Sequence, residues 1–167
     1  MPRSEVMITR TLRAEEVAGL APDLLELQRH AYRVEAALIG DDRIPPLHES
    51  VQDLVSAQLH WVVTFDGDRI AGALGYAVEG GAVDIDRLMI DPKYHRKGLG
   101  SSLVTEVMSL EARTIVATGR ENAPARALYE ALGFTHDADI EPVAGLWVSQ
   151  YSRHSIRITG AAADEPR

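Results

Sequence analysis

The sequence predicts one α/β domain in which strands and helices alternate along the chain. Strand-type and helix-type apolar patterns follow one another through most of the 167 residues, and neither an internal repeat nor a linker interrupts them. This length is sufficient to bury an ordinary hydrophobic core. We expect one domain over residues 1–158 and a flexible tail over residues 159–167, which is partly charged.

The predicted elements follow the order β-α-α-β-β-β-α-β-α-β-β. Strands are expected over residues 6–10, 61–65, 70–78, 83–90, 114–118, 134–140 and 146–152. Helices are expected over residues 14–38, 49–59, 98–110 and 122–133. Asp66-Gly67 is a strong signal for a hairpin between the second and third strands. The last two strands are expected to close the sheet as an antiparallel pair.

The two N-terminal helices carry start, stop and packing signals. The first is expected to break near Pro22, because proline has no N–H for a helical hydrogen bond. Its predicted buried face comprises Leu24, Leu25, Leu27, Ala31, Val34 and Leu38. The second helix is expected to begin near Glu49 or Ser50, after a loop that contains Pro45-Pro46.

Composition restricts the class of protein. The apolar fraction of 46% and charged fraction of 25% are those of a globular protein. No apolar run approaches the ~20 residues of a membrane span, and the absence of cysteine excludes disulfides and thiolate metal sites. The net charge of −8 argues against nonspecific nucleic-acid binding. We expect a cytoplasmic monomer or homodimer without nucleic-acid or membrane partners.

Residues 85–101 are the most informative stretch. They read as an apolar strand, a basic turn, two glycines and the start of an amphipathic helix. A helix N-terminus binds phosphate, because its first N–H groups lack partners and the macrodipole adds about half a positive charge. Gly98 and Gly100 let the backbone approach a ligand. The basic side chains beside them are Lys93, Arg96 and Lys97. Local positive charge in an acidic chain predicts a specific anionic ligand.

Three phosphate-binding motifs compete for this stretch. A Walker A loop requires Lys-Ser or Lys-Thr after its last glycine, whereas Lys97 precedes Gly98. A dinucleotide fingerprint requires a third small residue where Leu103 stands, although Glu121 lies at a suitable distance. His95-Arg96-Lys97-Gly98-Leu99-Gly100 resembles the pyrophosphate loop of the GNAT superfamily of acyl-CoA N-acyltransferases, with histidine at a place where glutamine or arginine is usual. For the loop alone, an ordinary glycine turn before a core helix is the alternative.

A second segment also resembles this superfamily. Residues 122–134 contain an asparagine, a small-residue helix, Leu128-Tyr129-Glu130 and Gly133-Phe134, which is similar to the other GNAT hallmark. Asn122 is expected to cap this helix, and Gly133 to end it in the left-handed conformation. The resemblance implies a mixed, mostly antiparallel sheet with helices on both faces. It also implies one splayed parallel pair, formed by the strands over 83–90 and 114–118.

The resemblance implies acetyl-CoA as cosubstrate and assigns roles to residues. The implied cofactor-binding residues are Leu88, Met89, Ile90, His95, Arg96, Lys97, Gly98, Leu99, Gly100, Ser101, Asn122 and Tyr129. Leu88 and Ile90 would pair with the pantetheine arm, and the Met89 region would offer an N–H to the thioester oxygen. Tyr129 would protonate the leaving thiolate, because a phenol is protonated at neutral pH. A half-buried packing tyrosine is the alternative.

The base is expected at Asp84 or Asp86. Strand alternation predicts that both carboxylates share one face with Leu88 and Ile90, and superfamily members with a protein-borne base carry it at these two places. Asp84 is the favoured base, and Asp86 would assist through water or bind the acceptor. The alternative is that both carboxylates hold a cationic substrate or pair with Arg87 or another cation.

The remaining polar residues give weaker signals. No histidine spacing indicates a metal site, so no metal is expected. His48, Glu49, Tyr32 and Glu35 are candidates for the acceptor cleft, but exposed positions on a loop and a helix are the favoured interpretation.

The expected function is transfer of an acetyl group from acetyl-CoA to a primary amine by direct attack in a ternary complex. The acceptor would be a small-molecule or peptide amine, and the net charge of −8 favours a cation. The alternatives are an acyl-CoA-binding sensor or subunit without turnover and, more weakly, a dinucleotide-binding oxidoreductase.

Overall fold

The computed structural model describes residues 6–155, and the predicted tail over residues 159–167 lies outside them. The strands are β1 (Met7–Thr11), β2 (His60–Asp66), β3 (Arg69–Glu79), β4 (Ala82–Ile90), β5 (Arg113–Gly119), β6 (Thr135–Val143) and β7 (Leu146–His154). The α-helices are α1 (Ala14–Ile39), α2 (Val51–Ser56), α3 (Leu99–Met108) and α4 (Ala123–Ala131). Two 3₁₀ turns, η1 (Pro45–His48) and η2 (Pro92–Tyr94), complete the described elements, which follow the predicted order.

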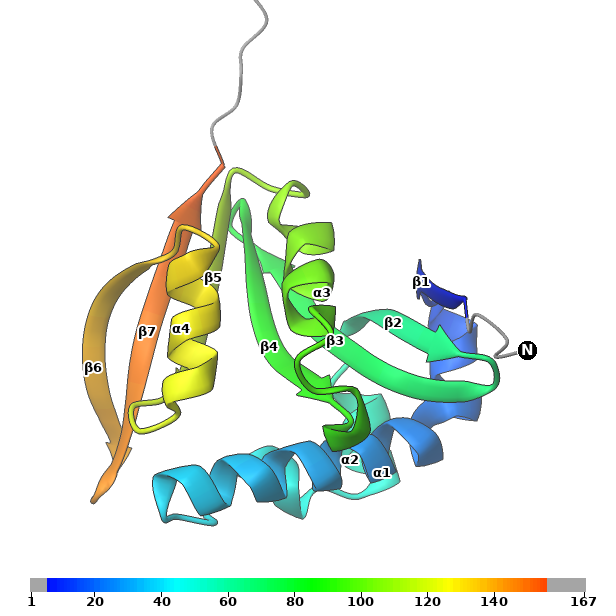
Figure 1. Cartoon of the computed structure of the whole chain (residues 1–167), viewed down its shortest axis with the longest axis horizontal. Helices are drawn as coiled ribbons and strands as arrows, with labels where there is room; N and C mark the ends of the chain where they lie inside the picture. The colour runs from blue at the N-terminus through cyan, green and yellow to red at the C-terminus, as the bar shows by residue number, and fades with distance from the viewer. Residues whose placement is uncertain (1–5, 156–167) are drawn as a thin grey trace, which may run out of the picture.

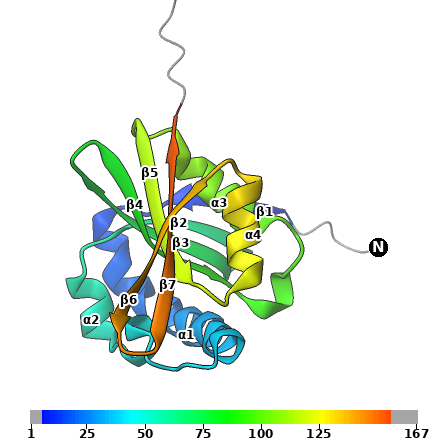
Figure 2. The same cartoon turned by 90° about the vertical axis from the view of Figure 1, so that its left-hand side faces the viewer.

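The strands form one seven-stranded sheet in the order β1-β2-β3-β4-β5-β7-β6. Every neighbouring pair is antiparallel except β4 and β5, which run parallel. Helices α1 and α2 lie on one side of the sheet, and α3 and α4 lie on the other (Figures 1 and 2). The mixed α/β fold with one parallel pair is therefore confirmed.

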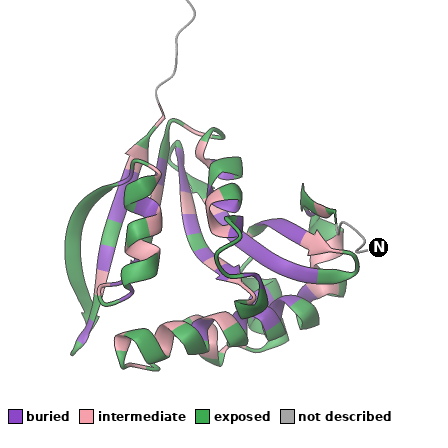
Figure 3. Cartoon of the chain, viewed as in Figure 1, coloured by how far each residue is buried: buried purple, intermediate pink, exposed green. Residues whose placement is uncertain are grey.

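Each face of the sheet has its own hydrophobic core. On the α1 face, Leu24, Leu54, Trp61 and Met89 belong to one buried cluster. On the α3 face, a second cluster contains Leu103, Val107 and the ring of Tyr129. Strand β6 at the sheet's edge is exposed along its whole length (Figure 3). The sheet thus separates two packed layers, and any ligand between β4 and β5 lies between them.

Helix α1 differs from the prediction in two respects. It runs through Pro22 without interruption, so the predicted break is wrong, although the helix changes direction in its first half in Figures 1 and 2. Proline removes one internal hydrogen bond, and the packed face on either side compensates. The predicted apolar face holds only in part, because Val34 and Leu38 are 37% and 46% exposed. The last turns of α1 therefore extend beyond the packed core.

The other helices begin largely where their caps predict. Ser50 caps α2, and its side chain and that of Asp53 each accept a backbone N–H from the other. Asn122 caps α4 by accepting the N–H of Ala125 at 3.2 Å. Leu110 lies beyond the end of α3 and is half exposed, so it does not join that helix's buried face. None of the helices within residues 6–155 is both long and apolar enough to cross a bilayer.

Strands β4 and β5 pair only over their first halves. The parallel register joins Ala82 to Arg113 and ends where Ile85 meets Val116. Beyond that point β4 continues to Ile90 and β5 to Gly119 without pairing to each other. The expected splay is therefore present, and it leaves one edge of each strand open.

A bulge in β4 changes which residues share a face. Tyr76 of β3 pairs with Ile85 and Gly75 pairs with Arg87, so Asp86 is the additional residue. Ile85 and Leu88 both pack into the α3-side core although they are three residues apart. Uniform alternation would place them on opposite faces. The prediction that Asp84 and Asp86 share one face with Leu88 and Ile90 is therefore wrong. The bulge between Ile85 and Arg87 reverses which face each later residue of β4 points to.

Candidate active site

The loop before α3 has the geometry of an anion-binding site. Arg96 and Gly98 both adopt left-handed backbone angles, with φ values of 65° and 75°. Gly98 is the N-cap of α3, and no side chain caps the helix. The N–H groups of Leu99, Gly100 and Ser101 therefore have no capping side chain and are available to a phosphate. The loop residues from His95 to Gly98 are exposed.

Two contacts fix the shape and charge of this loop. A Cβ placed on Gly100 would lie 3.3 Å from Leu128 Cδ2, so a larger residue would press on α4. Lys97 is held beside the loop with its ammonium 5.4 Å from the centre of the Tyr94 ring. Tyr94 in turn donates its hydroxyl to Asp66. The structure thus brings together the predicted loop residues, their backbone donors and a fixed positive charge.

The open edge of β4 also presents backbone groups. The N–H of Asp91 donates to Ala71 of β3 at 2.9 Å, so the backbone groups of Met89 and Arg87 also point toward β3. By alternation, Leu88 and Ile90 point their N–H and C=O groups away from β3, into the gap. Met89 itself is fully buried in the α1-side core. The predicted N–H donor for a thioester therefore moves from Met89 to Leu88 or Ile90.

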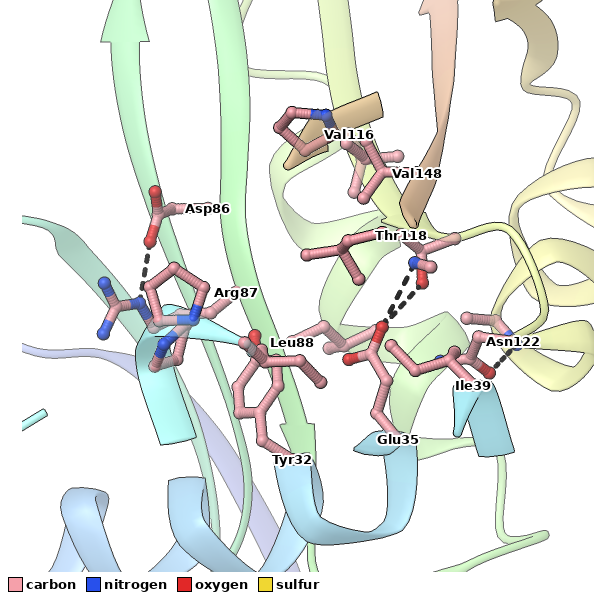
Figure 4. A pocket seen from close by; sticks show the side chains of 18 of the residues that line it. Tyr32, Glu35, Ile39, Asp86, Arg87, Leu88, Val116, Thr118, Asn122 and Val148 are labelled. Atoms are coloured by element: carbon pink, nitrogen blue, oxygen red, sulfur yellow. Dashed lines mark hydrogen bonds and ion pairs between the residues drawn. The ribbon is translucent and has the colours of Figure 1, made fainter. Parts of the chain in front are cut away.

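A cavity of about 310 Å³ occupies the gap between β4 and β5. Its walls come from the separated parts of both strands, from α4, from the C-terminal half of α1 with the loop after it, and from the β6–β7 hairpin. Figure 4 shows Tyr32 and Glu35 on α1, with Thr118 next to Glu35 and Val148 farther into the cavity. The volume is that of a small-molecule site.

Tyr129 places an unpartnered hydroxyl in the wall of this cavity. The residue is only 3% exposed, and its ring packs against Phe134 and Tyr151. No group of residues 6–155 hydrogen-bonds to the hydroxyl. Burial raises the pKa of Tyr129 well above its usual value, and the nearby Glu35 carboxylate adds to the shift. The phenol is therefore protonated at neutral pH and has its proton available to a ligand.

The two candidate bases lie in different surroundings. Asp86 lines the cavity, and its Oδ2 accepts the Nε–H of Arg87 at 2.7 Å. Asp84 lies in the paired part of β4, between Ala77 and Ile115, and is not part of the cavity wall. Burial raises the pKa of Asp84, and the charges of Asp86 and Glu79 add to the rise. Asp86 shares the cavity with Tyr129, whereas Asp84 does not.

A buried polar network holds Asp86 and the cavity wall in place. Arg87 is 6% exposed and donates to Gln28 at 3.0 Å and to Glu49 at 2.7 Å, as well as to Asp86. Gln28 donates to the carbonyl of Pro46 at 2.6 Å. Burial lowers the pKa of Arg87, but its hydrogen bonds to Glu49 and Asp86 outweigh this and raise it. The network joins α1, the Pro45-Pro46 loop and β4, so the predicted pairing of Asp86 with Arg87 is present.

Two residues that the sequence assigns to the surface line the cavity instead. Tyr32 is 8% exposed, and burial raises its pKa well above the usual value, with Glu35 adding to the rise. Glu35 Oε1 accepts the N–H of Gly119 at 3.2 Å and the hydroxyl of Thr118 at 3.3 Å. Their candidate place in the acceptor cleft thus agrees with the cavity lining, and Ile39 joins them at the spacing of one helix face. The expected exposed positions of Tyr32 and Glu35 are therefore wrong.

Glycine at position 119 permits this approach of α1 to β5. A Cβ there would lie 2.7 Å from Ile39 Cγ2 and 3.3 Å from Glu35 Oε1. His48 and Glu49 do not line the cavity: His48 Nε2 lies 2.7 Å from the carbonyl oxygen of Asp42, and Glu49 belongs to the Arg87 network. No group of three potential metal ligands occurs in the described part of the chain.

Comparison with known proteins agrees with this geometry. Residues 56–136 match the family model described as "Acetyltransferase (GNAT) domain". Among curated proteins, the chain is similar to UPF0157 protein YqkA of Bacillus subtilis (strain 168), with 31% identity over 143 residues. That match covers 84% of this chain and 42% of the relative, so the chain spans about two fifths of the relative's length.

Solved structures share the fold at low sequence identity. The ribosomal-protein-S18-alanine N-acetyltransferase of Escherichia coli has a TM-score of 0.71 and 18% identity, with 97% of this chain and all of that chain covered. The PaiA N-acetyltransferase of Thermoplasma acidophilum, in complex with coenzyme A, has a TM-score of 0.70 and 16% identity over 87% and 98% of the two chains. YncA of Salmonella typhimurium, solved with its cofactor acetyl-CoA, has a TM-score of 0.67 and 17% identity over 89% and 94%.

The sheet opens at one parallel pair of strands. An anion-binding loop lies outside the gap, and a candidate proton donor lies within it. Together these features are those of the acyltransferase class of α/β protein. Within that class, residues 56–136 match the GNAT acetyltransferase domain, and the chain as a whole has the fold of solved GNAT acetyltransferases.

Proposed function

We propose that the chain is an N-acetyltransferase that moves an acetyl group from acetyl-CoA to a primary amine by direct attack in a ternary complex. The observation that carries the proposal is the unpartnered hydroxyl of Tyr129, which is buried in the wall of the cavity between β4 and β5. The hydroxyl opens into the cavity and makes no hydrogen bond to residues 6–155, so it can reach a ligand there.

The loop and the open strand edge would hold the cosubstrate. Backbone N–H groups at the start of α3 bind the pyrophosphate, and the open edge of β4 at Leu88 and Ile90 pairs with the pantetheine arm. When bound, acetyl-CoA supplies an activated acetyl group as a thioester. A backbone N–H at this edge stabilises the developing oxyanion, an interaction that is typically worth ~3–4 kcal/mol of barrier.

The cavity residues would move the protons. Asp86 accepts a proton from the ammonium group, directly or through water, so that the neutral amine attacks the carbonyl carbon. As the carbon–sulfur bond breaks, Tyr129 donates its proton to the sulfur and the attacking nitrogen releases its second proton to water. The products are an amide and free CoA, and Tyr129 and Asp86 return to their starting protonation states by exchange with water. Because burial raises the pKa of Tyr129, the phenol still carries its proton when the thiolate begins to leave.

The sequence-based alternative of a CoA-binding sensor makes a different prediction. A sensor binds acetyl-CoA but releases no thiol with any amine, whereas the enzyme releases one thiol per amide formed. The family match over residues 56–136 favours acyl-CoA over the nicotinamide dinucleotide of the weaker alternative.

Two measurements test the proposal together. Calorimetric titration should show saturable binding of CoA and none of NAD(H). A thiol-release assay with acetyl-CoA and a panel of primary amines should give product confirmed by mass spectrometry. CoA binding without turnover on any amine would establish the sensor instead, and binding of NAD(H) in place of CoA would overturn both interpretations.

A further inference from the structure

The far side of the cavity indicates what kind of amine it accepts. We propose that the acceptor is a primary amine on an apolar body, such as an alkyl or arylalkyl group, and that Glu35 binds its ammonium group. This inference rests on the proposed N-acetyltransferase function and adds the substrate class.

The acceptor side of the cavity is walled by apolar side chains. The loop of α3 places CoA on the α3 side of the sheet, so the acceptor must reach the thioester from the α1 side. That side is built from α1, the loop after it and the β6–β7 hairpin. Its apolar residues are Ile39, Ile44, Pro46, Val143, Leu146 and Val148. Apolar surface of this kind stabilises an apolar ligand in proportion to the area that it removes from water.

The cations in the cavity wall are already paired. Arg43 holds Asp41 through two nitrogens, the closer contact at 2.7 Å. Arg87 is engaged by Glu49 and Asp86 at 2.7 Å each. A substrate carboxylate or phosphate would therefore have to compete with a protein carboxylate for either guanidinium. Of the two, Arg87 is buried and fully committed to Glu49 and Asp86, whereas the Arg43–Asp41 pair is solvent-exposed and therefore weak.

Glu35 leaves one carboxylate oxygen for the ligand. Its Oε1 is occupied by the N–H of Gly119 and the hydroxyl of Thr118, and these bonds fix the side chain across the cavity (Figure 4). Its Oε2 has no hydrogen-bond partner within residues 6–155. A half-buried carboxylate with one free oxygen binds an ammonium group in a charge-assisted hydrogen bond. Glu35 is thus a positioning carboxylate for the ammonium group, in the same cavity as the proposed base Asp86.

Polyamines and aminosugars fit this surface poorly. Each additional hydroxyl or amine of such a ligand loses water on entry and needs a protein partner there, and unpartnered polar groups lose affinity. The apolar residues of the acceptor side supply none, which leaves the Tyr32 hydroxyl and Asp86 among the polar groups of the wall as possible partners for a second polar group. Among the cationic acceptors that the net charge favours, the cavity therefore fits those with a single ammonium group and no other polar group.

A series of n-alkylamines from propylamine to hexylamine is the direct test, because these amines differ in apolar area but hardly in basicity. With acetyl-CoA saturating, kcat/KM should rise about fourfold for each methylene buried, until the cavity is filled. Ethanolamine, putrescine and glucosamine should be poorer substrates than propylamine. Calorimetric titration of the same amines into CoA-saturated protein should give the same order of affinity, without any turnover.

The variant Glu35→Gln tests the ammonium site. The amide oxygen still accepts the N–H of Gly119 and the hydroxyl of Thr118, but the negative charge is gone. KM for butylamine should rise at least tenfold while CoA affinity stays within twofold of wild type. Glu26→Gln is the matched control, because Glu26 is on the same helix, is exposed and lies away from this cavity. It should leave both constants unchanged.

The outcomes separate this inference from the proposed function. Amide formation with a flat alkylamine series, or with a preference for polar amines, would overturn the inference and leave the N-acetyltransferase in place. A preference for isovaleryl-CoA over acetyl-CoA with methylamine would show that the apolar wall receives the acyl group, which also overturns it. If the chain binds CoA but none of the amines gives thiol release, the proposed N-acetyltransferase function itself is wrong.

Discussion

Tyr129 combines burial, an unpartnered hydroxyl and a raised pKa at the point where two strands separate. We expect Tyr129→Phe to keep the ring in the core formed with Phe134 and Tyr151, and to remove only the proton donor. The value of kcat should fall by ~10²-fold or more, with CoA affinity nearly unchanged. Steady-state kinetics and calorimetry measure the two effects. A wild-type turnover number in this variant would assign the tyrosine to packing.

Asp86 and Asp84 provide a matched pair for identifying the base. Asn at position 86 retains an oxygen for the Nε–H of Arg87 but cannot take a proton, so Asp86→Asn should lower kcat by ~10²-fold and abolish the acidic limb of the pH–rate profile. Asp84→Asn should leave that limb in place, because Asp84 does not line the cavity. The reverse result would support the base favoured from sequence, acting through water. An intact limb together with a raised KM for the amine would instead make Asp86 a cation-binding residue.

At the scale of one element, the loop before α3 and the start of that helix contain two glycines with different roles. Gly98 adopts φ = 75° with open space where a Cβ would lie, whereas Gly100 faces Leu128. Gly98→Val and Gly100→Val should each weaken CoA binding at least tenfold, because a branched side chain disfavours the left-handed angle in one case and strains the α3–α4 contact in the other.

Gly67 supplies the control for this pair. It has φ = 58° and equally open surroundings, but it lies in the β2–β3 turn. Gly67→Val therefore introduces comparable backbone strain away from the loop, and CoA affinity should be retained. If calorimetry shows equal affinities in all three variants and in wild type, the loop is not the pyrophosphate site.

The start of α1 makes stability depend on acidity. Glu16 accepts hydrogen bonds from Arg10 of β1, at 2.9 Å and 3.0 Å, and from the backbone N–H of Arg13 at 3.0 Å. These interactions lower the pKa of Glu16 to about 2 from its usual 4.5. A lowered folded-state pKa stabilises the protein above the unfolded-state value, and this contribution is lost as the pH falls from about 4.5 to about 2.

Thermal denaturation of Glu16→Gln should therefore show a lower Tm than wild type at pH 7, with a difference that narrows below pH 4.5. Glu15→Gln is the appropriate comparison, because Glu15 is exposed in the same helical turn and no hydrogen bond fixes it in the described structure. A Tm difference that stays constant down to acidic pH would contradict the linkage.

At the scale of the whole molecule, the sequence predicts the part of the candidate site that we assign to CoA better than the part that we assign to the acceptor. The loop at Gly98 and the cap at Asn122 are local, because their chemistry depends on backbone angles set by adjacent residues. Their positions are accordingly predictable. The approach of Glu35 to Gly119 joins residues 84 positions apart and has no local signal.

Two other errors have the same physical origin. The bulge at Asp86 depends on how β4 pairs with β3, so alternation along β4 alone could not reveal it. Val34 and Leu38 are expected in the core because their spacing is helical and apolar. Periodicity identifies a face of the helix but does not show how far the sheet beneath it extends.

The walls of the cavity have a consequence for motion. The family match runs from residue 56 to residue 136, yet Tyr32 and Glu35 precede this region, and Leu146 and Val148 follow it. An amine that contacts both sets would bridge α1 and the β6–β7 hairpin, and so link the first and last parts of the chain. Hydrogen–deuterium exchange with CoA and hexylamine should slow in the second half of α1 and at the β6–β7 turn, beyond the effect of CoA alone. Unchanged exchange in either segment would mean that the amine does not bridge them. Because this link depends on the bound amine, the acceptor side would become ordered and disordered with each substrate, while the loop before α3 keeps its shape.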